Sequence, residues 1–275
     1  MKAPDFRYER PTDVEAALAL LADGDAAVLA GGQSLMPMMN FRLARPQVLV
    51  DLNRIDGLAG IAEDGEALRI GAMTRYADLA GSDLIATYAP LIARALPHIA
   101  HPAIRNRGTI GGSVALADPA AEMPALLMAM GAQIALRSTS GMREVAADDF
   151  FLGLYETARA EDELVTEIIV PKPAPGTRHG FYELARRHGD YAMAGVALAV
   201  GEAVRVAFFA VSDHALRAPE AEAALASGDI DAAAAGLEGL DFHADPNADV
   251  ATKKHLAGVV LRRAWAGSST GGNTA

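Results

Sequence analysis

The sequence contains no cysteine, and this absence excludes several kinds of chemistry. Without thiolates the chain has no disulfide bond, no cysteine nucleophile and no iron–sulfur cluster held by its own side chains. Seven histidines are present, but none belongs to a His-Glu-x-x-His motif. His98 and His101 lie three residues apart, yet Pro102 follows directly and no carboxylate accompanies them. Ordinary polar or partly buried histidines explain this spacing better than a metal site, so we expect none.

Aromatic residues are scarce, at 5% of the chain, and long apolar runs are missing. No stretch is long enough to span a membrane, and no apolar segment of a secretory signal precedes Asp5. Small Ala, Val and Leu side chains supply much of the 51% hydrophobic content over 275 residues. This is enough for one large domain or two modest domains of closely packed α/β layers. We therefore expect a soluble, cytoplasmic protein without an integral membrane segment.

A surplus of positive charge is missing as well, because 35 acidic residues face 24 basic residues and the net charge is −11. Binding of nucleic acid requires a concentrated basic stripe. The basic clusters here, such as 186–188, are short and are flanked by apolar or acidic residues. Nucleic acid is therefore not expected as a partner. A ligand that carries phosphate would have to be held largely by backbone N–H groups.

The first part of the chain alternates between helices and strands, as nucleotide-binding α/β units do. Thr12 and Glu15 have the spacing of a capping box, and Gly24 is typical of the residue that ends the following helix. The other elements predicted here are a buried strand at 26–30, a helix at 35–43 and a second buried strand at 48–50.

The middle of the chain is predicted to be α+β. Asp64-Gly65 indicates a hairpin between strands at 58–61 and 68–71. Ser82 is predicted to cap a helix that reaches about Leu96, and Asp118-Pro119 a helix that ends at Gly131. Two further strands are predicted near Ile134 and at 165–170.

A proline-rich segment at 171–176 has the composition of a linker between domains. Strands at 181–185, 192–200 and 204–211 are predicted to form an antiparallel sheet, followed by helices that end with 249–266. The final segment, 267–275, is rich in Gly, Ser and Thr and is predicted to be disordered.

Two diglycine loops are the best candidates for a binding site. Gly31-Gly32 follows a predicted strand, and Gly111-Gly112 lies downstream. Glycine lets the backbone approach a ligand closely, and successive N–H groups in such a turn form a concave anion site. Two such loops can clamp one diphosphate from both sides. Neither loop has the Rossmann or P-loop spacing, and each by itself is compatible with an ordinary tight turn.

Taken together, the segments 30–37 (Ala-Gly-Gly-Gln-Ser-Leu-Met-Pro) and 107–113 (Arg-Gly-Thr-Ile-Gly-Gly-Ser) closely resemble one family. This family comprises the FAD-binding medium subunits of molybdenum hydroxylases, including aerobic carbon monoxide dehydrogenase and, more distantly, the flavin domain of xanthine dehydrogenase. The resemblance continues at 118–122 (Asp-Pro-Ala-Ala-Glu) and 186–192 (Arg-Arg-His-Gly-Asp-Tyr-Ala). It covers almost the whole chain in the same order.

The resemblance implies an α+β fold with two α/β FAD-binding subdomains of the PCMH, or vanillyl-alcohol-oxidase, type. They would cover about 1–56 and 57–170, which together form an FAD-binding domain at 1–170. A C-terminal domain at 177–266 would combine a three-stranded antiparallel sheet with a helical bundle. The predicted linker at 171–176 falls where this plan needs a boundary.

The resemblance also implies a set of cofactor-binding residues, with no catalytic or metal-binding residue in this chain. They are Ala30, Gly31, Gly32, Gln33, Ser34, Leu35, Thr109, Ile110, Gly111, Gly112, Ser113, Glu122, Val165, Glu183 and Tyr191.

In these implied roles both loops wrap the FAD pyrophosphate through N–H groups, helped by the Ser34 and Thr109 hydroxyls. Glu122 matches the position that holds the adenosine ribose, Val165 an adenine-side backbone contact and Tyr191 a position near the isoalloxazine ring. For each of these three residues a purely structural role stays open.

The resemblance does not fix the group at the polar edge of the flavin or the roles of two arginines. Distant relatives have a lysine near the position of Tyr182 or Glu183, where this chain has none, so the identity of the group that faces the polar edge of the flavin stays open. Arg105 and Arg107 flank the second loop and are either phosphate ligands or solvated side chains.

The function implied is electron transfer within a heterotrimer, often doubled into a dimer of heterotrimers. FAD in this chain would take electrons from [2Fe–2S] clusters on a small subunit and pass them to an external electron acceptor. A large subunit with a molybdenum–pterin cofactor would oxidise the substrate. One alternative is a self-sufficient flavoprotein oxidase or dehydrogenase, but no convincing base lies near either loop. The other is a scaffold subunit without flavin, against which two intact diglycine loops argue.

Overall fold

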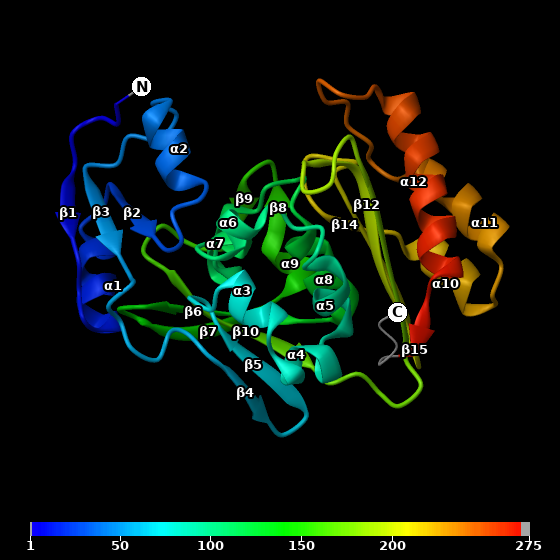
Figure 1. Cartoon of the computed structure of the whole chain (residues 1–275), viewed down its shortest axis with the longest axis horizontal. Helices are drawn as coiled ribbons and strands as arrows, with labels where there is room; N and C mark the ends of the chain where they lie inside the picture. Colours follow the sequence, from blue (N-terminus) through cyan, green and yellow to red (C-terminus); the bar gives the residue numbers. More distant parts are fainter. Residues whose placement is uncertain (1, 271–275) are drawn as a thin grey trace.

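The computed structural model describes residues 2–270, which fold into three larger sheets, a two-stranded ribbon and the helices that pack on them. Figure 1 shows the three sheets side by side, in the order of the chain from the N-terminal part to the C-terminal part. No helix within residues 2–270 is long and apolar enough to cross a membrane.

The N-terminal part is a parallel sheet in which β3 lies between β1 and β2. Its elements are β1 (Arg7–Glu9), α1 (Val14–Ala22), β2 (Ala26–Leu29), α2 (Leu35–Asn40) and β3 (Val48–Asp51). The predicted capping box is wrong by one residue: Asp13 caps α1, and its carboxylate accepts the N–H of Ala16 at 2.8 Å. Gly24 follows the end of α1 with a φ of +84°, as predicted for a residue that terminates a helix.

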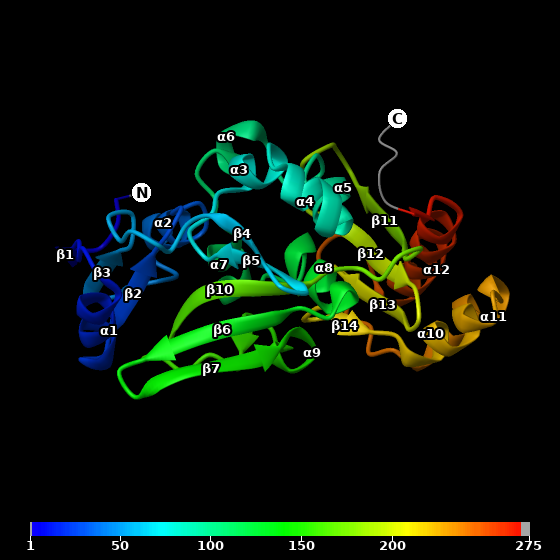
Figure 2. The same cartoon turned by 90° about the horizontal axis from the view of Figure 1, so that it is seen from below.

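The middle part is a five-stranded antiparallel sheet in the order β4-β5-β10-β6-β7. The strands are β4 (Ile61–Asp64), β5 (Ala67–Gly71), β6 (Gln133–Ser138), β7 (Gly141–Ala146) and β10 (Leu164–Pro171). The helices are α3 (Tyr76–Ala80), α4 (Asp83–Tyr88), α5 (Pro90–Ala95), α6 (Pro102–Arg105), α7 (Ile110–Leu116), α8 (Glu122–Met130) and α9 (Ala147–Phe150). A ribbon of β8 (Phe151–Gly153) and β9 (Glu156–Thr157) follows α9. In Figure 2 the helices α3 to α8 lie along one side of β6 and β7.

Three predictions in this part are wrong. The helix capped by Ser82 is divided into α4 and α5, because a residue before proline avoids the helical region and Ala89 takes φ −130° and ψ 56°. Asp118 does not cap α8, which begins at Glu122; its carboxylate instead accepts the N–H of Ala120 in the preceding turn. The first hairpin strand begins only at Ile61.

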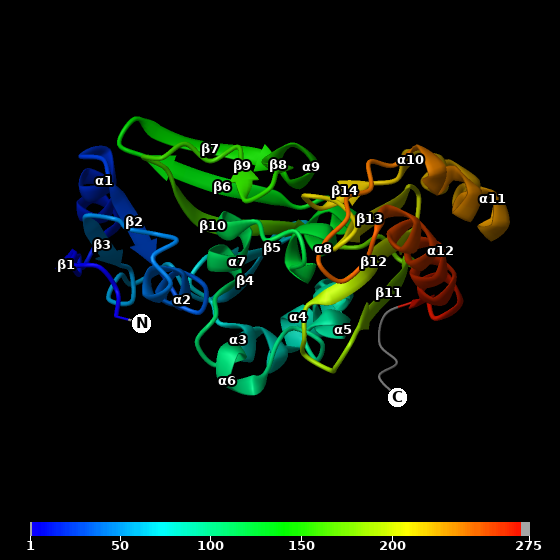
Figure 3. The same cartoon turned by 90° about the horizontal axis from the view of Figure 1, so that it is seen from above.

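The C-terminal part is a five-stranded antiparallel sheet in the order β14-β13-β12-β11-β15. Its strands are β11 (Arg178–Ala185), β12 (Ala192–Val200), β13 (Val204–Phe209), β14 (Leu216–Arg217) and β15 (Ser269–Thr270). The helices are α10 (Pro219–Ala226), α11 (Ile230–Ala235), α12 (Val250–Ala266) and the short 3₁₀ helix η1 (Gly236–Gly239). Figure 3 shows α10 to α12 together on one side of this sheet.

The sheet therefore contains the three predicted strands and two additional edge strands of two residues each. One of them, β15, lies within the segment that was predicted to be disordered, so this prediction does not hold for Ser269 and Thr270. The rest of that segment beyond Thr270 lies outside the described residues.

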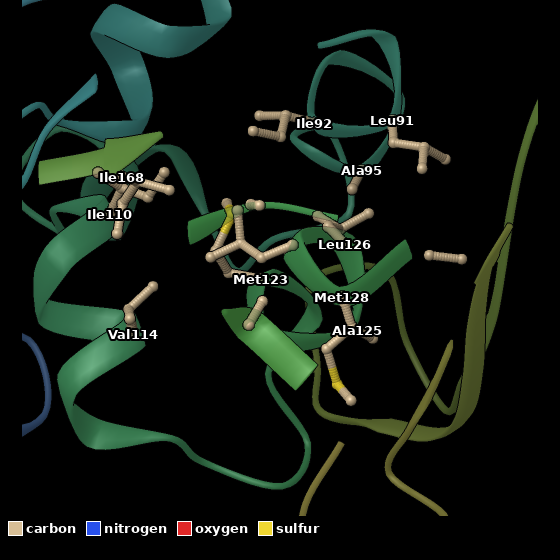
Figure 4. Packing of buried hydrophobic residues seen from close by; sticks show 14 of the residues in the cluster. Leu91, Ile92, Ala95, Ile110, Val114, Met123, Ala125, Leu126, Met128 and Ile168 are labelled. Atoms are coloured by element: carbon tan, nitrogen blue, oxygen red, sulfur yellow. The ribbon is translucent and has the colours of Figure 1, made fainter. Parts of the chain in front are cut away.

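Helix α8 packs between the middle and the C-terminal sheets. Eight of its nine residues are buried, including Glu122 at its first position. Its apolar side chains belong to the largest core cluster, which also contains residues of β10 and β13. Figure 4 shows Met123, Leu126 and Met128 of α8 packed between α5, α7 and the neighbouring strands. Close packing on all sides fixes the start of α8, and with it Glu122.

The C-terminal domain contains a buried lysine. Lys253 of α12 is 1% exposed, and its ammonium group donates to Met193 O, Ala210 O and Asp245 Oδ2 at 2.6–2.7 Å. All three N–H bonds of the ammonium group are used, so the charge is buried with its hydrogen-bonding capacity satisfied.

Candidate functional site

The two diglycine loops, which are about 80 residues apart in the sequence, lie backbone to backbone. A Cβ atom on Gly31 would lie 2.1 Å from the carbonyl oxygen of Arg107, which precedes the second loop. A Cβ atom on Gly112 would lie 3.6 Å from the Cβ of Ala30. Only glycine allows the approach at Gly31, because any side chain would collide with backbone. The folded chain thus brings together the two motifs that the sequence singled out.

The first loop, residues 30–34, connects β2 to α2 and offers unpaired hydrogen-bond donors. Gly32 takes a φ of +71°, and Asn53 Nδ2 donates to the carbonyl of Ala30 at 3.0 Å. Among the described residues, none accepts a hydrogen bond from the backbone N–H groups of Gly31, Gly32, Gln33 or Ser34. Four consecutive unpaired donors at the surface of a cavity favour an anionic ligand.

The second loop differs, because the N–H groups of Ile110 to Ser113 have partners within the chain. Ile110 and Gly111 donate to Thr74 O and Ala72 O at 3.0 and 2.9 Å. Gly112 donates to Thr109 Oγ1 at 3.2 Å, and Ser113 to Thr109 O at 3.2 Å. What this loop offers to a ligand is therefore its glycine surface and the hydroxyl groups of Thr109 and Ser113.

A cavity of about 660 Å³ lies between the loops, within the range of small-molecule and cofactor sites. Its lining extends from Leu21 to Tyr191 and draws on all three parts of the chain. The predicted site residues that line it are Ala30, Gly31, Gly32, Gln33, Ser34, Leu35, Thr109, Gly111, Gly112, Ser113, Glu122, Val165 and Tyr191.

Two predicted site residues do not line the cavity. The side chain of Ile110 is fully buried in the core cluster and lies near Val114 and Ile168 (Figure 4). Glu183 lies in β11 with its carboxylate buried behind the cavity wall. Arg105, a candidate phosphate ligand from the sequence, donates hydrogen bonds to Ile99 O and Ala100 O at 2.8 and 2.9 Å and so has a structural role.

One end of the cavity lies against the N-terminal part. Val165 lines it beside Leu164, which packs in the apolar cluster of α1 and β3. Arg159 and Glu163 also line this end and were not predicted. Glu163 is held by Arg143 at 2.6 Å, and this hydrogen bond lowers the pKa of the Glu163 carboxyl. No sequence motif marks Arg159 and Glu163, because their hydrogen bonding depends on the turn between β9 and β10.

The other end lies against the C-terminal part and contains Tyr191. Tyr191 is 67% exposed as a whole residue, while its hydroxyl is hydrogen-bonded to Asp118. Desolvation of the hydroxyl and the nearby charge of Asp118 raise the pKa of Tyr191 to about 12. The preceding loop is pressed against the turn after α5: a Cβ on Gly189 would lie 2.7 Å from Ala100 O. This contact fixes Tyr191 at the mouth of the cavity.

Glu122 belongs to this second end. It is 8% exposed, and burial together with the charges of Glu183 and Asp118 raises the pKa of its carboxyl to about 8. Its charge also contributes to the raised pKa values of Tyr76 and Tyr191. Glu122 is therefore mostly protonated at neutral pH and can donate a hydrogen bond into the cavity.

Glu183, whose charge contributes to the raised pKa of Glu122, does not line the cavity. Its Oε1 lies 3.5 Å from Nδ1 of His98, whereas its Oε2 is buried without a hydrogen-bond partner among the described residues. His98 lies in the turn between α5 and α6, and its ring packs on Phe181 at a centroid distance of 5.3 Å. Tyr76, which burial gives a raised pKa, bonds to Ser113 and completes the polar wall. Neither His98 nor Tyr76 was predicted.

Within residues 2–270, no three or more His, Asp or Glu side chains are arranged to hold a metal ion. The site provides a cavity whose lining includes unpaired backbone N–H donors, the carboxyl of Glu122 with its raised pKa, and Tyr191.

Comparison with known proteins gives one consistent family. A family model described as the FAD binding domain in molybdopterin dehydrogenase matches residues 4–173, and the CO dehydrogenase flavoprotein C-terminal domain matches residues 179–268. The chain is 43% identical to the 6-hydroxypseudooxynicotine dehydrogenase complex subunit alpha of Paenarthrobacter nicotinovorans, over 88% of this chain and 86% of that one. It is 41% identical to the carbon monoxide dehydrogenase medium chain of Afipia carboxidovorans, over 94% and 95%. A solved structure of carbon monoxide dehydrogenase from Hydrogenophaga pseudoflava superposes with a TM-score of 0.92 at 42% identity, over 97% and 99%.

Proposed function

Because this chain belongs to the FAD-binding medium subunits of carbon monoxide dehydrogenase-type molybdenum hydroxylases, we propose that it transfers electrons through its FAD from [2Fe–2S] clusters of a small subunit to an external acceptor. The resemblance and the α+β fold predicted from the sequence are confirmed, and the chain is an oxidoreductase component.

The observation that carries the proposal is the row of four unpaired N–H groups at Gly31 to Ser34, facing a cavity of cofactor size. A diphosphate is the part of FAD that such donors suit. The residues present therefore fit the cofactor, even though the chain has a net charge of −11. Lysine is not needed where backbone donors are already oriented.

The second loop would contribute differently from the first. The N–H groups of Ile110 to Ser113 are already used within the chain, so Thr109 and Ser113 would contribute their hydroxyls. Gly111 and Gly112 would leave room for the cofactor, and Ile110 would act only by packing the loop against the core.

We assign the two halves of FAD to the two ends of the cavity. Val165 and Leu164 would face the adenine, and Tyr191 the isoalloxazine ring. Glu122 would bond a sugar hydroxyl, but its coupling to Asp118 and Tyr191 favours the ribityl chain next to the ring over the adenosine ribose. Glu183 would act on the cofactor only through Glu122.

Bound FAD would supply the redox chemistry, because a flavin exchanges electrons with both one-electron and two-electron partners. The chain would bind and orient it and would control the protons near its ring. The clusters must be held elsewhere, since the chain has no cysteine. A small [2Fe–2S] subunit, a large molybdenum–pterin subunit, a dimer of heterotrimers and a cytoplasmic location complete the proposal.

The test uses the complex purified with its partner subunits, with and without flavin. Substrate should reduce the clusters in both forms, but only the flavin-containing form should pass electrons on to the acceptor. Equal reduction of the acceptor by both forms would contradict the proposal. Reduction of the flavin in the isolated chain by an organic substrate would indicate a self-sufficient flavoprotein, and a chain that takes up no FAD would indicate a scaffold.

A further inference from the structure

The first three carbonyl groups of the first loop have hydrogen-bond partners within the chain. Ala30 O accepts from Asn53 Nδ2 at 3.0 Å, and Gly31 O accepts from Gln33 Nε2 at 3.2 Å. The next carbonyl accepts a backbone N–H from α2 at 3.3 Å. In a planar trans peptide the C=O and the following N–H point to opposite sides. Each held carbonyl therefore turns the next N–H of the loop away from the group that holds it.

Glycine makes such a constraint necessary at the first peptide of the loop. The Ala30–Gly31 peptide bond is trans, and it can flip with little strain because glycine tolerates φ of either sign. A flipped peptide would present the carbonyl oxygen of Ala30 in place of the N–H of Gly31, and that oxygen would repel a phosphate. Gly31 itself must stay a glycine, since its Cβ would lie 2.1 Å from Arg107 O. The orientation of this peptide therefore has to be fixed by another residue.

Asn53 supplies this constraint from the end of β3. The parallel ladder between β2 and β3, which lie side by side in Figure 1, ends where Leu52 N donates to Leu29 O at 3.1 Å. The side chain of Asn53 then donates to the following carbonyl, that of Ala30. Asn53 is exposed and outside the cavity lining, whereas Ala30 and Gly31 line the cavity. The N–H of Gly31 therefore points away from Asn53.

Asp51 in turn fixes the side chain of Asn53. Its Oδ1 accepts both the backbone N–H of Asn53 at 2.9 Å and the side-chain Nδ2 at 2.6 Å. Its Oδ2 accepts the hydroxyl of Tyr8 in β1 and lies 3.4 Å from Arg10 Nε. Burial by itself would raise the pKa of the Asp51 carboxyl, but hydrogen bonds from Tyr8 and Asn53 hold this pKa below its usual value. The carboxylate of Asp51 is therefore an acceptor only, and it requires a donor at position 53.

A side-chain amide meets both demands at position 53. Nδ2 of Asn53 has a carboxylate oxygen and a carbonyl oxygen as neighbours, and its two N–H bonds serve both acceptors. Aspartate has the same shape but offers only acceptors when ionised, so it would repel both neighbours. Alanine would remove the donor without adding repulsion.

We propose that Asn53 is a positioning residue for the FAD diphosphate: held by Asp51, it fixes the Ala30–Gly31 peptide with the N–H toward the cofactor. The inference rests on the proposed function, which assigns the diphosphate to the first loop. Asn53 acts on the cofactor only through the backbone of this loop. The affinity for FAD consequently depends on the hydrogen-bonding capacity at position 53 and not on the shape of the side chain.

The first experiment measures the affinity of the full chain for FAD by titration with flavin fluorescence as the signal. Asn53→Ala leaves the peptide free to flip and should weaken binding by about 10-fold, the low end of the contribution of a hydrogen bond to a charged group. Asn53→Asp should weaken binding further, because its carboxylate repels Ala30 O and favours the flipped peptide. A role of the side-chain shape alone predicts the reverse order, since aspartate keeps the shape of asparagine. That reverse order would overturn the proposal.

The matched control is Asn40→Ala, which changes an exposed asparagine at the end of α2 outside the cavity lining. It should bind FAD as tightly as the wild-type chain. Thermal unfolding without FAD should give nearly the same midpoint for Asn53→Ala and wild type, because Asn53 is exposed. Wild-type affinity for FAD in both Asn53 variants would overturn the proposal.

The second experiment observes the peptide itself. The full chain is labelled with [¹⁵N]glycine, and the amide proton signal of Gly31 is followed by NMR as FAD is added. In the wild-type chain this signal should move downfield, because the N–H becomes a donor to a phosphate oxygen. In Asn53→Asp saturated with FAD the displacement should be largely lost. An equal displacement in both proteins, or none in the wild type, would contradict the positioning role.

These measurements detect binding of FAD and involve no electron flow, so the electron-transfer role can fail without affecting them. Equal affinity for FAD in all variants would remove the positioning role of Asn53 and leave the proposed function intact. A wild-type chain that takes up no FAD would contradict the proposed function, and this inference with it.

Discussion

Replacing Glu122 by glutamine should make the chain more stable than the wild type at alkaline pH. The pKa of Glu122 is raised by burial from 4.5 to about 8 in the folded chain. Below pH 4.5 the carboxyl is protonated in both the folded and the unfolded chain, and its favourable contribution is fully present. As pH rises toward 8, the unfolded chain releases the proton while the folded chain retains it, so the free energy of unfolding falls.

The magnitude follows from the width of this window. Each pH unit between the two pKa values costs about 1.4 kcal/mol of stability. From pH 4.5 to pH 8 the loss approaches about 5 kcal/mol as an upper bound, a large part of the stability of a typical protein. Glutamine keeps the shape and a hydrogen-bond donor but does not titrate, so Glu122→Gln should be spared this loss.

The assay is urea unfolding followed by circular dichroism, at several pH values across the window and above it. The difference in free energy between variant and wild type should be small at the acid end, should grow as pH rises toward 8, and should level off above it. Glu220→Gln, an exposed change on α10, is the matched control and should show no such trend. Parallel stability curves for Glu122→Gln and wild type would refute the assigned protonation state.

Three other substitutions test the cavity and the domains around it. Gly31→Ala should abolish binding of FAD, because its Cβ would lie 2.1 Å from a backbone oxygen. The measurement is the flavin absorbance of the purified chain. The control is Gly258→Ala, at a helix position with open space, which should bind FAD normally and be stabilised by about 1 kcal/mol. Lys253→Met should lower the free energy of unfolding by about 3–5 kcal/mol in thermal or urea unfolding, since it leaves Asp245 and two buried carbonyls without their partner. Glu163→Gln should lower the free energy of unfolding by about 1 kcal/mol at neutral pH, because the hydrogen bond from Arg143 lowers the pKa of Glu163. This stabilisation is present above pH 4.5 and is lost as pH falls further. The free energies of unfolding of the variant and the wild type should therefore converge in acid.

Local signals in the sequence predicted the elements that end at strong caps. Gly24 and Gly131 both take positive φ at the helix ends where they were expected, and Asp249 caps α12. The break between α4 and α5 was missed although Pro90 is visible in the sequence, because the flanking residues continue a helical pattern of apolar side chains. The strand β7 was missed because five of its six residues are exposed and its sequence has no apolar alternation.

The site was predictable as far as its motifs reach. Thirteen predicted residues line one cavity, since the two diglycine loops are recognisable without knowledge of the fold. Which N–H groups are free was not predictable, because the partners of the second loop, Ala72 and Thr74, come from the segment after β5. The pairing of Glu183 with His98 has no sequence signal either, since 85 residues separate them and only the packing of α5 on β11 brings them together.

The cavity lining extends from Leu21 to Tyr191, and this has a consequence for synthesis of the protein. Domains fold as the chain leaves the ribosome, N-terminal part first. The first loop, residues 30–34, is among the first segments to emerge, yet the part of the cavity lining that contains Tyr191 is made only after two thirds of the chain has been translated. A nascent chain therefore contains the first loop early, but it cannot enclose a cofactor until its C-terminal sheet has begun to form. Loading of FAD is accordingly expected to be a late event in the synthesis of the chain.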